Sequence, residues 1–111
     1  ERRHHIPLVM TGGALVGTPV VIDKIGSQSG IAATILRLMG IRADLPFGRD
    51  LLDVHTAGFG YVSEPSWFGL VTERGLSAVS TDTGATLEGD SADVRAAKAL
   101  VQSIYTDLSK R

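Results

Sequence analysis

The sequence predicts an α+β fold in the order strand, helix, antiparallel meander of three to four strands, C-terminal helix. Three observations predict it. Residues 6–10 (Ile-Pro-Leu-Val-Met) are apolar without alternation, which is typical of a buried strand. Segments of strand length alternate with turn residues between Phe59 and Leu87. Residues 90–109 repeat apolar side chains with the period of a helix.

The first part of the chain is expected to contain two short strands. Pro7 lacks an amide donor, so it belongs at the first residues of its strand or at a sheet edge. Thr11-Gly12-Gly13 closes that strand, and residues 20–22 (Val-Val-Ile) form the second candidate.

A helix is predicted over residues 30–39, followed by an irregular stretch over 42–55 with one helical turn near Asp50. Ser27 or Ser29 can cap the helix, and Gly40 suits the left-handed residue that ends it. Its apolar face is formed by Ile31, Ile35, Leu38 and Met39.

A meander and a second helix are predicted for the rest of the chain. The strand-length segments are 59–63, 68–72 and 76–81. Pro65-Ser66 and Arg74-Gly75 separate them as turns, and Thr86-Leu87 starts a fourth strand. Asp90 then opens a helix to about residue 109. Its apolar stripe, expected to pack on the sheet, is Val94, Ala97, Val101, Ile104, Tyr105 and Leu108.

Composition excludes several classes of function. The net charge of -1 argues against a nucleic-acid partner. The absence of cysteine excludes disulfide scaffolds, thiolate metal sites and cysteine nucleophiles from this segment. No apolar run approaches the roughly 20 residues that span a bilayer, so we expect the chain itself to be soluble.

The residues do not form a self-contained catalytic set or a metal site. His4 and His5 are neighbours on an extended segment, where their side chains point to opposite faces and cannot easily chelate one ion. His55 is the third histidine and has no partner of metal-site spacing. We therefore predict no catalytic residue, no metal ligand and no cofactor within the chain.

Asp82-Thr83-Gly84 follows an apolar segment, as the active-site triplet of an aspartic protease does. A dimer with one such triplet per chain would supply the two carboxylates of that chemistry. However, the helix motif of retroviral proteases follows the triplet, whereas Gly48-Arg49-Asp50-Leu51-Leu52 precedes it here. A tight turn between two strands is the favoured interpretation, and the dimeric protease is a remote alternative.

Trp67 and Phe68 lie together beside Pro65 in the predicted meander. They could form an interaction surface, which would make the chain a free-standing small binding module. Aromatic residues in a hairpin more often fill the core beneath a helix.

A series of segments along nearly the whole chain has an order and spacing that carry a resemblance. They are residues 5–10, 26–28 with 31–36 and 38–41, 47–52 (Phe-Gly-Arg-Asp-Leu-Leu), 59–61, 67–72 and 105–109. Together they resemble the C-terminal part of sulfatases, and most of all the lipoteichoic acid synthase-like, phosphoglycerol transferase-type branch of the alkaline phosphatase superfamily.

The resemblance implies that residues 1–111 are one C-terminal subdomain of a doubly wound α/β enzyme. Residues 1–57 would join the parent sheet, and residues 58–111 would form the meander and terminal helix. The parent would hydrolyse or transfer sulfate or phosphate esters through a Thr, Ser or modified Cys and a divalent metal (Mn, Mg, Ca or Zn), all upstream of this chain. It would be membrane-associated, with its catalytic part in the periplasm or on the exterior of the bacterial cell membrane.

Further expectations follow from this resemblance. His4 and His5 lie where the chain leaves the metal-bearing loop and could border the substrate. The partner of the chain would be the rest of the catalytic domain, without which the fragment is inactive and self-associates. One departure concerns the first helix: family members begin it Gln-x-Asp-Ile, whereas this chain has Gln28-Ser29-Gly30-Ile31.

Overall fold

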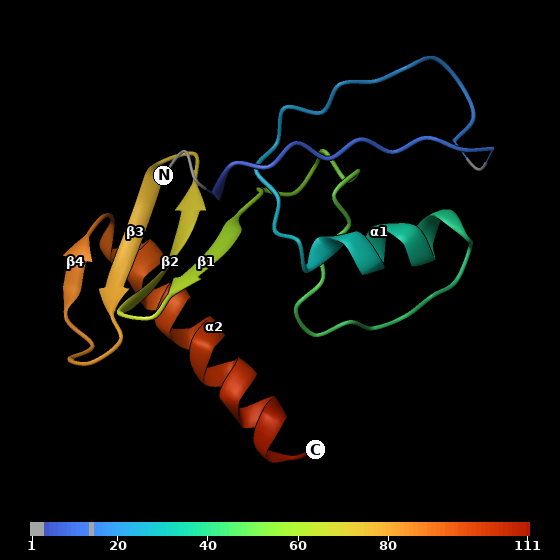
Figure 1. The fold of residues 1–111 in the computed structure, drawn as a ribbon. Helices are drawn as coiled ribbons and strands as arrows, with labels where there is room; N and C mark the ends of the chain where they lie inside the picture. The colour runs from blue at the N-terminus through green and yellow to red at the C-terminus, as the bar shows by residue number, and fades with distance from the viewer. Residues whose placement is uncertain (1–3, 14) are drawn as a thin grey trace. The chain divides into compact units, whose positions relative to one another are not determined.

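The computed structural model describes residues 4–13 and 15–111, which fall into two compact units (Figure 1). The boundary lies between Gly58 and Phe59. The boundary predicted from the sequence lies one residue earlier, between residues 57 and 58.

The first unit contains α1 (Gly30–Leu38), which confirms the predicted helix. It ends as predicted at Gly40, which has a φ of 72°. The Gly40 N–H donates to the Arg37 carbonyl at 2.9 Å, and the Ile41 N–H donates to the Leu36 carbonyl at 2.9 Å. This pair of bonds satisfies carbonyls that the end of the helix would otherwise leave open.

Of the two predicted capping residues, Ser27 and Ser29, Ser29 does not cap α1. Ser29 has helical backbone angles, φ −59° and ψ −21°, and its side chain makes no capping hydrogen bond. The chain instead enters the helix through backbone bonds, from the Gly30 N–H to the Ser27 carbonyl and from the Ile31 N–H to the Gln28 carbonyl. A serine caps only when its backbone is extended, so the cap at Ser29 was wrong.

The two strands predicted before α1 are not strands in this structure. Residues 6–10 and 20–22 form no ladder with any part of the chain that the structure describes. Figure 1 shows the described parts of 4–26 as long runs without helix or strand. Val9 is 81% exposed and Val21 is 93% exposed. Apolar strand propensity cannot produce a strand unless a second strand supplies hydrogen-bond partners.

Residues 42–55 are irregular, as predicted, and so is Phe59, which was predicted to begin the first strand of the meander. At Asp50 the chain forms a turn and not the predicted turn of helix. The Leu52 N–H donates a hydrogen bond to the Asp50 carboxylate at 3.0 Å.

The second unit contains an antiparallel sheet in the order β1-β2-β3-β4, which confirms the predicted meander and its fourth strand. The strands are β1 (Gly60–Glu64), β2 (Trp67–Thr72), β3 (Gly75–Ser80) and β4 (Thr86–Glu88). Pro65-Ser66 joins β1 to β2 as predicted. The turn between β2 and β3 is Glu73-Arg74, because Gly75 already pairs with Thr72.

The chain ends in α2 (Ser91–Ser109), which packs against β2 and β3 (Figure 1). Asp90 caps it as predicted, accepting hydrogen bonds from the Ala92 and Asp93 N–H groups. Within the predicted stripe, Val94 and Ala97 are buried.

The far end of that stripe is not covered. Tyr105 is 68% exposed and Leu108 is 59% exposed. A 19-residue helix is about 28 Å long, whereas a six-residue strand spans about 20 Å. The last turns of α2 therefore extend past the sheet, as Figure 1 shows.

Candidate functional site

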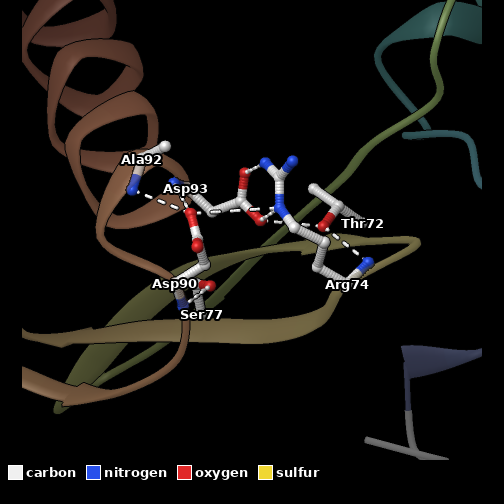
Figure 2. A network of polar contacts seen from close by, with 6 residues as sticks. All are labelled: Thr72, Arg74, Ser77, Asp90, Ala92 and Asp93. Atoms are coloured by element: carbon white, nitrogen blue, oxygen red, sulfur yellow. Dashed lines mark hydrogen bonds and ion pairs between the residues drawn. The ribbon is translucent and has the colours of Figure 1, made fainter.

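A polar cluster joins the turn between β2 and β3 to the beginning of α2 (Figure 2). Its centre is Asp93, which is only 4% exposed. The Asp93 carboxylate accepts a hydrogen bond from Thr72 Oγ1 at 2.8 Å and one from Arg74 Nε at 3.1 Å. Arg74 Nη2 donates to its other oxygen. Arg74 and Asp93 thus form a two-point ion pair, the geometry that suits a guanidinium and a carboxylate best.

Two further residues attach the start of α2 to the sheet. Ser77, which is buried on β3, accepts a hydrogen bond from the Asp90 N–H at 3.0 Å. The Asp90 carboxylate accepts from the Ala92 N–H at 2.8 Å (Figure 2). The side chains of the cluster therefore occupy the amide donors that begin α2 and fix that end of the helix.

The electrostatics agree with this structural role. The hydrogen bond from Arg74 holds the pKa of Asp93 below its ordinary value, and Asp93 in turn raises the pKa of Arg74. The contacts of the cluster tie the beginning of α2 to β3 and to the turn between β2 and β3 (Figure 2). They give the cluster a structural role.

Trp67 and Phe68, the predicted interaction surface, lie on opposite faces of the sheet. Phe68 and Thr72 share a face because they are an even number of residues apart, and Thr72 contacts α2 through Asp93. Phe68 is therefore on the face that α2 covers. Trp67 is on the other face, which we call the helix-free face because α2 does not lie on it. The structure thus separates the two aromatic residues that the sequence grouped.

The helix-free face is mainly apolar. The cross-strand register places β1, β2 and β3 side chains next to one another on it. The apolar ones are Val62, Trp67, Val71, Leu76 and Ala78, and the polar Glu64 and Ser80 lie beside Trp67 on the same face. Val62 and Ala78 are buried, whereas Trp67, Val71 and Leu76 are half-buried.

Asp82-Thr83-Gly84 forms the exposed turn between β3 and β4. The Gly84 N–H donates to the Ser80 carbonyl at 2.9 Å, and the Ser80 N–H donates to the Ala85 carbonyl at 2.9 Å. The turn geometry accounts for the residue types in this triplet without catalysis.

The histidines do not come together in a metal site. His4 is half-buried, and His5 and His55 are exposed. Among residues 4–13 and 15–111, no group of three or more His, Cys, Asp or Glu side chains could hold a metal ion.

Residues 47–52 contact the beginning of α1 in the first unit. The Leu51 side chain lies against Gly26 and Gly30, close enough that a Cβ at Gly30 would lie 2.7 Å from Leu51 Cδ2. The Leu51 N–H donates to Thr34 Oγ1 at 2.8 Å, and that hydroxyl donates to the Gly30 carbonyl at 2.8 Å. Thr34 is fully buried. The 47–52 segment is therefore held against the first turns of α1.

Charged side chains support this contact. Arg37 on α1 forms an ion pair with Asp50. Lys24 donates to the Asp53 carbonyl and to Thr56 Oγ1 at 3.3 Å. The backbone N–H of His55 donates a hydrogen bond to the Asp53 carboxylate at 2.9 Å. This bond holds the pKa of Asp53 below its ordinary value.

No helix among the described residues is both long and apolar enough to cross a membrane. No protein-family model, curated protein or solved structure matches the chain.

Proposed function

We propose that the chain is the C-terminal structural subdomain of a metal-dependent sulfatase or phosphoglycerol transferase-like enzyme that acts on sulfate or phosphate esters. In this proposal the catalytic residues lie upstream of the chain, and the chain completes the catalytic domain without contributing a reacting group. The parent enzyme would work in the periplasm or at the exterior of the bacterial cell membrane.

The contact between the two family-like segments in the first unit carries the proposal. Residues 47–52 and the α1 sequence resemble the family by order and spacing, and in the structure Leu51 packs on Gly30 and bonds to Thr34. Because residues 47–52 pack against α1, there is a physical reason for the spacing of these two segments in the sequence. Gly30 stands where the family has Asp, and a Cβ there would overlap the Arg49 carbonyl oxygen, so the close approach of residues 47–52 to α1 depends on the glycine of this chain.

The exposed apolar side chains before α1 support the same proposal. Ile6 is 65% exposed and Val9 is 81% exposed, and neither belongs to a strand. Exposed apolar residues on an extended segment are suited to pairing with a larger sheet.

The divalent metal of such an enzyme does not fit the residues described here, since they form no cluster of three ligands. Its ligands would lie in the upstream part of the parent, so no step of the reaction is assigned to a residue of this chain. His4 and His5 stay as proposed neighbours of the substrate.

The test is an ester hydrolysis assay on the complete native polypeptide that contains these residues. We expect it to hydrolyse an aryl sulfate or aryl phosphate, to lose activity with EDTA and to regain it with a divalent metal. Residues 1–111 alone should be inactive under all these conditions.

Two variants of the complete polypeptide connect the assay to this chain. Leu51→Ala should lower the amount of folded, active enzyme, because Leu51 fills the space between Gly26 and Gly30. Leu87→Ala is the matched control, because Leu87 is 57% exposed on β4. Metal-dependent turnover by residues 1–111, or a complete polypeptide without metal-dependent activity, would overturn the proposal. In the second case a binding module centred on Trp67 becomes the better interpretation.

A further inference from the structure

We draw no further inference here: the strongest candidate, the helix-free face of the sheet around Trp67, Val71 and Leu76, carries nothing because nothing in the structure shows what covers it.

Discussion

At the residue scale, Asp93 has the most consequential environment in the second unit. Its carboxylate is buried and accepts three hydrogen bonds from Thr72 and Arg74. Asp93→Asn keeps the size of the side chain but removes the charge and replaces one acceptor oxygen by a donor. We expect it to lower the free energy of unfolding by about 1–3 kcal/mol, as measured by urea denaturation followed by circular dichroism.

Asp107→Asn provides the matched control. Asp107 also pairs with an arginine, Arg111, at 2.9 Å, but this pair lies at the exposed end of α2. The control should change the free energy of unfolding by less than about 0.5 kcal/mol. Equal effects of the two substitutions would show that the Asp93 cluster does not stabilise the unit.

The lowered pKa of Asp93 also gives the stability of this unit a pH dependence. A carboxyl group whose pKa is lower in the folded state contributes stability above its unfolded-state pKa of about 4. That contribution is lost as the pH falls through the folded-state pKa, with Arg74 as the main cause of the shift. Urea titrations from neutral pH down to pH 3 should therefore show a decline that is smaller in Asp93→Asn. An unchanged decline in the variant would assign the pH dependence to other groups.

The sequence did not predict the partners of Asp93. Arg74 is 19 residues away from Asp93 in the sequence and lies on the turn between β2 and β3. A pairing of this kind depends on how the helix lies on the sheet. The same reason explains Trp67 and Phe68: alternation along β2 predicts opposite faces, but only the position of α2 shows which face is covered.

At the scale of elements, the close packing of residues 47–52 on α1 can be tested at Gly30. A methyl group at this position would overlap the Arg49 carbonyl oxygen and the Leu51 side chain. Gly30→Ala should destabilise the first unit by about 1–3 kcal/mol, despite the higher helix propensity of alanine. Hydrogen exchange at the Leu51 amide, which bonds to Thr34, would measure the loss.

Gly13→Ala is the control for that substitution. Nothing lies within 4 Å of a Cβ built at Gly13. Its effect on Leu51 exchange should be negligible. If the Leu51 amide exchanges as slowly in Gly30→Ala as in the unsubstituted chain, the contact between residues 47–52 and α1 is looser than the structure indicates.

Elements with local signals were predicted well. The meander follows from turn residues between short apolar segments, and α2 follows from Asp90 and the three-and-four spacing behind it. The strands at 6–10 and 20–22 were wrong for this structure because pairing is not local: an apolar segment becomes a strand only beside another strand. Ser29 does not cap α1 because its backbone angles are helical, and the residue type alone does not determine those angles.

At the scale of the whole molecule, the two units differ in how much apolar surface they bury. Among residues 4–13 and 15–111, the buried hydrophobic side chains all belong to the second unit, namely Val62, Leu70, Ala78, Val79, Val94 and Ala97. The described part of the first unit leaves many large apolar side chains exposed, including Val9 and Val21. Such a surface favours association in water.

We therefore expect residues 1–111 to form dimers or larger species at high concentration, measured by light scattering. Val9→Asp combined with Val21→Asp should shift the population toward monomer. Ser91→Asp combined with Gln102→Asp adds the same charge at exposed positions of α2 and should leave the association unchanged. If the unsubstituted chain of residues 1–111 is monomeric at high concentration, the expectation is wrong.

Trp67 is the only tryptophan among the 111 residues, and it lies half-buried on the helix-free face. Its indole emission is therefore an optical reporter that needs no label and reads one side of one sheet. If association leaves the surroundings of Trp67 unchanged, the emission maximum should stay in place. A shift to shorter wavelength would instead indicate that water has left the surroundings of the indole ring.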